Sequence, residues 1–296
     1  MKMNFKLKAL ALTAIMTASA PALAVIEGGP TGNGELLLNV RYYGGTSATT
    51  GGDDISGLFD LGIKMNDFVA LNGQAGFSKS WDLTQGPYNA AWNQVTSFVT
   101  IHGGALSDIR FNVIALNSAQ INVPGGVSYL TTANVDQYPV IGNGNVKQFA
   151  NMQQYIDANN TRGTNATDAH GASAALPTDP TNSFFGAING FGQGDTWLQK
   201  AGLDTTQPLG TSQNFWFLTT SSTSTLAKGI TTPFGVDVNH DGSIAGNEFS
   251  KFTLNADGSL AFASPVVSPI PEADSWAMLL AGLGVLGAMV RRRTEV

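Results

Sequence analysis

The sequence has no cysteine and few charged residues. Among its 296 residues Cys is absent, His occurs three times, and charged side chains make up 12%. The lack of Cys excludes disulfides and any zinc or iron–sulfur site with Cys ligands. Stability must therefore come from packing, hydrogen bonds or a metal ion held by oxygen ligands. A hydrophobic fraction of 43% is too high for an acidic disordered tail and predicts a globular, loop-rich protein.

Positive charge is scarce between the two ends of the chain. Six of the 15 Lys and Arg residues lie within the first eight positions or at positions 291–293. Residues 25–270 hold nine basic and 18 acidic side chains, a net charge of −9. Such a body repels phosphate backbones, which argues against nucleic acid as a partner.

No sequence motif for catalysis is present. The three histidines, His102, His170 and His240, form no H-E-x-x-H pair, and there is no G-x-S-x-G elbow, phosphate loop or dinucleotide fingerprint. We interpret these histidines as surface or loop residues and the pair Asp53-Asp54 as solvated loop charges. The sequence therefore predicts a protein that is not an enzyme.

The first 24 residues have the features of a secretory signal peptide. Three Lys precede an apolar stretch over 9–16, and Ala22 and Ala24 form a small-x-small cleavage site. We expect the Sec machinery to export the chain and the mature protein to begin at Val25. The alternative is a buried N-terminal helix.

The last residues predict a membrane helix in which the positive charge follows the apolar run, the reverse of the order in the signal peptide. Pro271-Glu272-Ala273 precedes an uncharged run over 275–290, which ends at Arg291-Arg292-Arg293. As a helix this run is about 24 Å long, which can span a hydrocarbon core of roughly 30 Å if the bilayer thins. The arginines then stay in the cytoplasm and the body lies outside. A permanent tail anchor and a buried helix are the alternatives.

Residues 269–296 resemble the PEP-CTERM sorting signal. The resemblance lies in the Pro-Glu pair, the apolar run and the three terminal arginines, in that order. It implies cleavage near Pro271-Glu272 by exosortase at the inner membrane, then release or attachment at the surface of an exopolysaccharide-making Gram-negative cell. It therefore implies a secreted or cell-surface protein of a biofilm. Ala273 departs from the commonest pattern, which has Pro at the third position.

The strand and turn patterns of residues 25–266 predict a mainly β extracytoplasmic domain. We expect an antiparallel β-sandwich-like fold with one or two inserted α-helices. Residues 35–43 alternate, with Leu36, Leu38, Val40 and Tyr42 on one face, as in a half-buried strand. Asp257-Gly258 predicts a hairpin turn near the end of the domain. The expected strands are 35–43, 57–65, 97–101, 109–116, 127–131, 214–220 and 251–262.

Helical and loop segments are predicted between these strands. Phe149, Met152 and Ile156 recur at helical spacing within 146–158. A second helix near 183–201 contains four glycines, which disfavour it. The polar stretch 159–182 is expected to be an exposed loop, or a linker between two lobes.

Residues 237–248 match the calcium-loop pattern D-x-[DN]-x-[DN]-G-x₅-E. Side-chain oxygens of Asp237, Asn239 and Asp241, the carbonyl of Ser243 and the carboxylate of Glu248 are the predicted Ca²⁺ ligands. Pro-Phe-Gly at 233–235 argues against a helix before the loop, so we expect an isolated calcium loop in a β protein. The alternative is a metal-free turn capped by its own Asp and Asn side chains.

Three functions remain open. The first is a non-enzymatic, exported surface or matrix protein associated with exopolysaccharide and stabilised by calcium. The second is a carbohydrate-binding or adhesive module, in which one ring of Phe215-Trp216-Phe217 could stack on sugar. The third, which has least support, is a hydrolase of matrix polymers, which would need two carboxylates in one pocket.

Overall fold

The computed structural model describes residues 25–44, 52–179, 182–186, 201–267, 278–286 and 289. The chain forms two compact units, residues 1–265 and 266–296. In the described part of the second unit, residues 278–286 are helical with exposed side chains. The signal peptide, the motif positions 271–273 and 291–293, and several positions of the predicted membrane helix 275–290 lie outside the described residues. Within the described ranges, no helix is both long and apolar enough to cross a membrane.

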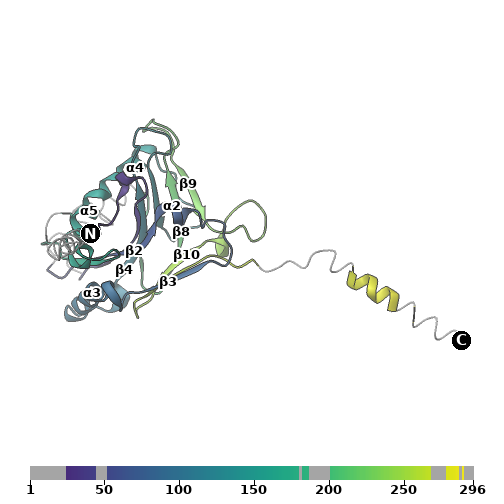
Figure 1. The fold of residues 1–296 in the computed structure, drawn as a ribbon, viewed down its shortest axis with the longest axis horizontal. Helices are drawn as coiled ribbons and strands as arrows, with labels where there is room; N and C mark the ends of the chain where they lie inside the picture. The colour runs from purple at the N-terminus through teal and green to yellow at the C-terminus, as the bar shows by residue number, and fades with distance from the viewer. Residues whose placement is uncertain are drawn as a thin grey trace, which may run out of the picture. The chain divides into compact units, whose positions relative to one another are not determined.

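The first unit is built on one curled sheet of eleven antiparallel strands (Figure 1). The strand order is β3-β11-β10-β8-β5-β4-β1-β2-β6, with β7 paired to β4 and β9 paired to β8. The strand bounds are β1 Glu35–Tyr42, β2 Ile55–Lys64, β3 Ser78–Asp82, β4 Arg110–Asn117, β5 Ser128–Thr132, β6 Ala172–Ala175, β7 Gln207–Pro208, β8 Ser212–Thr219, β9 Ile230–Phe234, β10 Lys251–Leu254 and β11 Ser259–Ala263.

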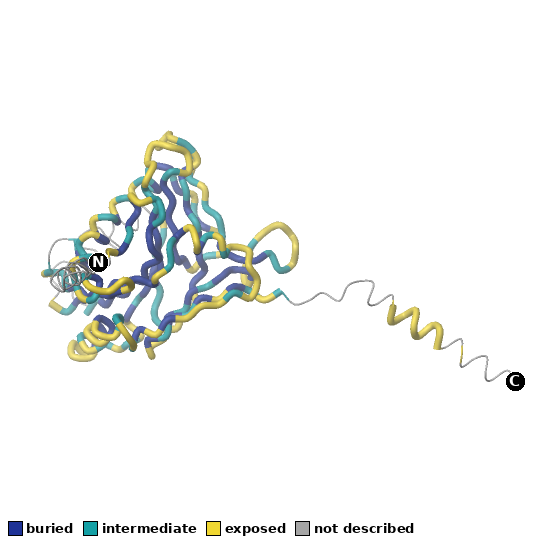
Figure 2. The backbone as a smooth tube through the Cα atoms, viewed as in Figure 1, coloured by how far each residue is buried: buried dark blue, intermediate teal, exposed yellow. Residues whose placement is uncertain are grey.

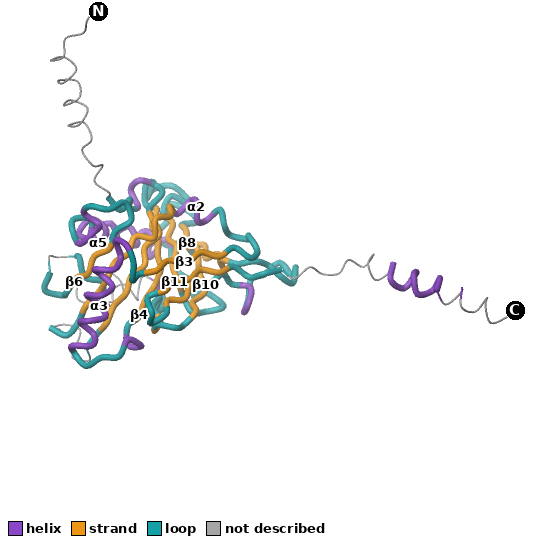
Figure 3. Tube along the Cα trace, turned by 60° about the horizontal axis from the view of Figure 1, so that its bottom comes forward, coloured by secondary structure: helices purple, strands orange, loops and turns teal. Residues whose placement is uncertain are grey.

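Short helices connect and cover these strands (Figure 3). The α-helices are α2 Met65–Val69, α3 Asn89–Ile101, α4 Asn143–Gln148 and α5 Met152–Asn159. The 3₁₀ turns are η1 Gly29–Thr31, η2 Gly86–Tyr88, η3 Leu106–Asp108, η4 Phe149–Asn151, η5 Gly163–Ala166 and η6 Gly246–Glu248.

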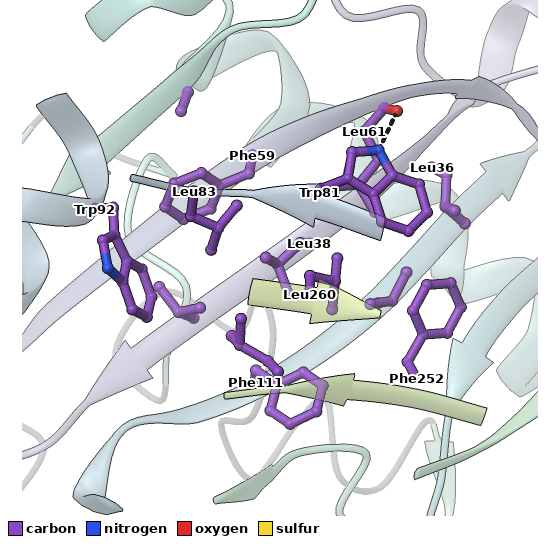
Figure 4. Close-up of a cluster of buried hydrophobic side chains, with 14 of the residues drawn as sticks. Leu36, Leu38, Phe59, Leu61, Trp81, Leu83, Trp92, Phe111, Phe252 and Leu260 are labelled. Carbon is purple, nitrogen blue, oxygen red and sulfur yellow. Dashed lines mark hydrogen bonds between the residues drawn. The ribbon is translucent and has the colours of Figure 1, made fainter. Parts of the chain in front are cut away.

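One face of the sheet packs an aromatic core. The even-numbered residues of β1, from Leu36 to Tyr42, all belong to it. Phe68 of α2 lies among rings from the four strands β8 to β11, with centroid distances of 4.8 Å to Phe262 and 5.6 Å to Phe215. Figure 4 shows Trp81 beside this cluster, where its indole Nε1 donates a hydrogen bond of 2.9 Å to the Leu61 carbonyl. Burial of this area is the main stabilising contribution on this face.

The other face of the sheet is covered by α4, η4 and α5. Phe149 stacks on Tyr129 of β5 at 4.2 Å between ring centroids. The Tyr155 hydroxyl donates to Asn39 Oδ1 at 2.9 Å, and Asn39 Nδ2 donates to Asn112 Oδ1 at 3.0 Å. All eight residues of β1 are therefore buried, and the central strands are dark along most of their length in Figure 2.

The prediction of a mainly β, antiparallel fold is confirmed, but the arrangement differs from a sandwich. The strands form one sheet because β8 pairs with β5 and β9 along Phe215–Thr219 and with β10 along Ser212–Asn214. The hairpin at Asp257-Gly258 joins β10 to β11 as expected. The helix expected over 146–158 is present as α4, η4 and α5 in succession.

Several local predictions were wrong. Residues 97–101 belong to α3, because Trp92, Val95 and Val99 meet the core at helical spacing. The stretch 159–182 is not a plain exposed loop, since it contains β6, whose four residues are buried against β2. Strand β1 is buried on both faces and not half-buried.

The Asp53-Asp54 pair is not fully solvated either. Asp54 is buried, and its Oδ1 accepts a hydrogen bond of 3.1 Å from the Gly44 N–H. This contact fixes the end of the β1–β2 connection. The second predicted helix, near 183–201, lies largely outside the described residues.

Candidate calcium loop and adjoining groove

The candidate calcium loop connects β9 to β10. Its base is closed by a β-bridge between Gly235 and Phe249, and by a hydrogen bond of 2.9 Å from Val236 N–H to the Glu248 carbonyl. Ser250 N–H donates to the Phe234 carbonyl at 2.8 Å. Strand β9 precedes the loop, the 3₁₀ turn η6 forms its last three residues, and β10 follows, so the loop is framed by β structure as the sequence predicts.

Side-chain oxygens in the first half of the loop accept hydrogen bonds from its main chain. The two carboxylate oxygens of Asp237 accept from Asp241 N–H at 3.1 Å and from Gly242 N–H at 2.9 Å. Asn239 Oδ1 accepts from the same Asp241 N–H at 2.9 Å. His240 and Gly242 both have positive φ, 60° and 84°, and the turn at Gly242 suits a residue without a side chain. Two predicted ligands thus converge on one main-chain group.

Glu248 closes the loop from its other end. The residue is buried, and its Oε1 accepts from Val238 N–H at 3.0 Å and Asn239 N–H at 3.1 Å. Its Oε2 accepts from Ala245 N–H at 3.2 Å. One carboxylate therefore binds both the start and the end of the loop.

The loop has no cationic partner within the described part of the chain. None of the ion pairs found there includes Asp237, Asp241 or Glu248. Hydrogen bonds from the hydroxyl and N–H of Ser243 lower the pKa of Asp241, so this carboxylate is ionised at neutral pH. Three carboxylates thus lie close together in sequence, and no cationic side chain among the described residues forms an ion pair with them.

The predicted ligands share one loop but are not grouped as a closed metal shell. Among the described residues, no cluster of three or more His, Asp or Glu side chains is arranged to hold a metal ion. The oxygens instead point to main-chain N–H groups, as in the capped-turn alternative. Both carboxylate oxygens of Asp237 and Oε2 of Glu248 accept one hydrogen bond each and keep a second lone pair, whereas Oε1 of Glu248 accepts two. The donor set, all hard oxygen, therefore still fits Ca²⁺.

A groove of about 680 Å³ adjoins this loop. Its lining includes the loop residues 242–245 together with Tyr138 and Trp216, whose ring centroids are 5.5 Å apart. Asp136 also lines the groove, and its Oδ1 accepts a hydrogen bond of 3.2 Å from Asn214. The sequence pointed to Trp216 through its aromatic run, but no sequence signal pointed to Tyr138, because it lies in the irregular segment between β5 and α4.

A second polar cluster, formed by Glu35, Asp60 and His170, lies near the start of β1. Burial and the neighbouring Asp60 raise the pKa of Glu35 to about 7. Burial also raises the pKa of Asp60, whose Oδ2 lies 3.6 Å from Nδ1 of the exposed His170. All three histidines are exposed, as expected. Sequence reasoning missed this cluster because its members lie far apart in the chain and meet only through strand pairing.

Comparison with known proteins finds a family match for the C-terminal tail but none for the folded domain. Residues 269–293 match the model of the PEP-CTERM protein-sorting motif. Neither the curated proteins nor the solved structures that were compared include a match to the chain. The motif covers the Pro-Glu pair at 271–272, the apolar run and the three arginines. The chain therefore carries a PEP-CTERM sorting motif and is an exported protein sorted by exosortase.

Proposed function

We propose that this chain is a non-enzymatic protein of the cell surface or extracellular matrix, associated with exopolysaccharide and stabilised by calcium. The observation that carries the surface role is the sorting motif at residues 269–293. On this proposal the Sec machinery exports the chain, its tail crosses the inner membrane transiently, and exosortase cuts near Pro271-Glu272. The folded domain is then attached to the surface or released.

Calcium is proposed because of the β9–β10 loop. The ligand residues from Asp237 to Glu248 supply three carboxylates, one amide oxygen and the Ser243 carbonyl, the ligand types that Ca²⁺ prefers. The loop is fixed to the core at its base through Phe249, whose ring centroid lies 5.2 Å from that of Trp216. A bound ion would therefore stabilise the connection that leads into the last hairpin of the domain.

The proposal that the chain is not an enzyme rests on the positions of its carboxylate side chains. Glycoside hydrolysis uses two carboxyl groups on opposite sides of the scissile bond. The groove beside the loop is lined by one side-chain carboxylate, that of Asp136. The pair formed by Glu35 of β1 and Asp60 of β2 is buried and so is poorly placed to meet a polymer.

Cell fractionation tests the surface role. In cells that contain exosortase, protease treatment of intact cells should remove the domain, or the domain should appear in the medium. Without the exosortase the chain should stay with the inner membrane. A chain carrying Pro271→Ala and Glu272→Ala should behave like wild type in the strain without exosortase. An Asp257→Asn chain, changed in the last hairpin of the domain, is the control and should be sorted normally. Identical fractionation in both strains would contradict the proposal.

Carbohydrate binding is a second candidate function, and the groove beside the loop favours it.

A further inference from the structure

We propose that one end of the curled sheet, the apolar tip, docks on an anionic lipid surface. The apolar tip consists of the β4–β5 loop 118–127, residues 137–148, which include α4, and residues 220–230, which form the β8–β9 loop and the start of β9. This loop lies at the upper end of β9 in Figure 1, where most of the chain is exposed in Figure 2. The inference goes beyond the proposed surface role and requires neither calcium nor cleavage of the tail.

Exposed apolar side chains are concentrated at this tip. In the described part of the first unit, seven large apolar residues are exposed, and five of them belong to the tip. Leu226 is 95% exposed and Val140 is 75% exposed. The other three are Ile121, Val123 and Ile230. Single exposed apolar residues are common on protein surfaces, but several gathered at one place indicate an interaction site.

Strand pairing brings the two loops of the tip together. Thr219, the last residue of β8, pairs with the first residue of β5 on one side and with the first residue of β9 on the other. The loops that precede β5 and β9 therefore lie at the same end of the sheet. Gly125 N–H donates a hydrogen bond of 2.7 Å to the Thr220 carbonyl, which joins the two loops directly.

The segment before α4 borders the β8–β9 loop. An antiparallel bridge pairs Gly142 with Lys228. The same register places Val140 opposite Ile230, and both of these residues are exposed. Apolar side chains from three separate segments are thus neighbours at one end of the sheet.

A buried asparagine fixes the β8–β9 loop. Asn143, the first residue of α4, is fully buried. Its Nδ2 donates to the carbonyls of Ser222 and Ser224 at 3.1 and 2.9 Å. Its Oδ1 accepts from Ser221 N–H at 3.0 Å. Leu226 therefore projects from a loop whose main chain is held by α4, and little conformational entropy remains to be lost on docking.

The apolar tip carries positive charge in an acidic protein. Its three segments contain Lys147 and Lys228 but no Asp or Glu, whereas residues 25–270 have a net charge of −9. Lys147 Nζ donates to the carbonyl of Thr223 at 2.9 Å, which is a neutral group. None of the ion pairs among the described residues includes either lysine. Both lysines can therefore bind an anionic partner.

Acidic side chains lie away from these two lysines. Asp136 is bonded to Asn214, five residues along β8 from its end at the tip, a separation of roughly 16 Å. The acidic residues around Lys64, near the start of β1, lie four strands from β9, a separation of roughly 19 Å. Both separations exceed the screening length of about 8 Å at physiological ionic strength.

An anionic bilayer uses both features of the tip. Leu, Ile and Val side chains enter the boundary between headgroups and acyl chains, while nearby lysines contact lipid phosphates. A soluble polyanion would bind the lysines but leave the apolar side chains in water. A second copy of the chain would bring like charges together when two tips meet. A lipid surface with negative headgroups is therefore the partner that fits.

A site-specific fluorescent probe tests this assignment. Because the chain has no cysteine, a single introduced Cys carries the label. The full chain with Ser224→Cys, two residues from Leu226, is labelled with the environment-sensitive dye NBD and reconstituted into vesicles. The matched probe is Ser107→Cys, another exposed serine, which lies before β4 and so at the end of that strand remote from the tip. Both chains keep the tail, so its insertion affects the two equally.

In vesicles of phosphatidylcholine and phosphatidylglycerol, the Ser224 probe should shift to shorter emission wavelength and be quenched by nitroxide-labelled lipids. The Ser107 probe should do neither. Adding Leu226→Ser to the Ser224→Cys chain should lower the ratio of docked to undocked domain roughly 10-fold, because one apolar side chain no longer enters the bilayer. Lys228→Gln should lower it roughly 5-fold, and only in the anionic vesicles.

Ile101→Ser is the matched control for the apolar change. Ile101 is 79% exposed at the end of α3, and Gly104 just beyond it lies against Tyr42, at the end of β1 remote from the tip. This variant should leave the quenching unchanged, and circular dichroism should show that all variants are folded.

Three results would overturn the assignment. The first is quenching at Ser224 no greater than at Ser107, and the second is equal quenching at Ser224 in anionic vesicles and in phosphatidylcholine alone. The third is a Ser224 emission shift that grows with chain concentration in lipid-free detergent, which would assign the tip to a second copy. Exosortase sorting is measured separately, so none of these results bears on the surface role.

Discussion

Removal of calcium and substitution of Glu248 should produce separable losses of stability. If Ca²⁺ is present at 100 times its Kd, binding to the folded state adds about 2.7 kcal/mol to the free energy of unfolding. For a domain of this size, 1 kcal/mol corresponds to roughly 2–4 °C in Tm. A chelator should therefore lower the wild-type Tm by about 5–11 °C.

Glu248→Gln should act in two ways. An amide can still accept from Val238 and Asn239 through its oxygen, but its NH₂ group faces the Ala245 N–H, so one charge-assisted hydrogen bond is lost. This loss should cost about 1–3 kcal/mol in chelator. The variant also lacks the bidentate carboxylate, and so its Tm should no longer respond to calcium.

Scanning calorimetry of the full chain, with calcium and with chelator, measures both effects. Asp257→Asn is the matched control, because Asp257 also caps a turn through Ser259 N–H and hydroxyl but belongs to no calcium pattern. This control should respond to calcium as wild type does. Identical wild-type curves in the two conditions would refute the calcium site, and a calcium response that persists in Glu248→Gln would refute its ligand role.

Three further predictions concern the domain. Since the pKa of folded Glu35 is about 7, above the ordinary 4.5, the folded state binds the extra proton between these values, and its stability falls as pH rises through that window. Glu35→Gln should match wild type near pH 4.5 but be more stable at pH 8, on the order of 1–2 kcal/mol after allowing for solvent screening; urea unfolding measures this, and an equal difference at both pH values contradicts it. Tyr155→Phe leaves Asn39 Oδ1 without its donor and should cost about 1–3 kcal/mol by the same method, whereas no loss would mean that the Asn39 network is not stabilising. Gly258→Ala should be more destabilising than Gly242→Ala. Both glycines have φ near 85°, where a side chain costs roughly 1–2 kcal/mol, but only at Gly258 would the added Cβ lie 2.9 Å from Trp92. Equal melting temperatures of the two variants would show that this contact relaxes freely.

Strands with a strict alternation were predictable from the sequence. The even-numbered residues of β1 and the Asp257-Gly258 hairpin were found because local pattern and turn chemistry agree with the final packing. The alternation of apolar and polar residues gave a wrong prediction of exposure where polar residues are buried. Asn39 occupies a position that alternation assigns to solvent, yet Asn112 and Tyr155 supply its hydrogen bonds from distant elements.

Other features depend on long-range contacts that the sequence does not encode locally. The β-branched residues at the end of α3 favour a strand by propensity, but helical spacing of its apolar residues against the core prevails. The small residues of β6 give no hydrophobic period, so this strand was not predicted. The calcium-loop residues were predictable as a motif, while the groove arises only when Tyr138 and Trp216 meet across the fold.

The most direct test of the account is the intact mass of the chain in cells with and without exosortase. The sorting motif over residues 269–293 predicts a mature chain that has lost the segment following the Pro271-Glu272 region when exosortase is present. The same chain should keep that segment, including its three arginines, when exosortase is deleted. Recovery of the uncut tail from both strains would contradict the central claim that exosortase processes this protein.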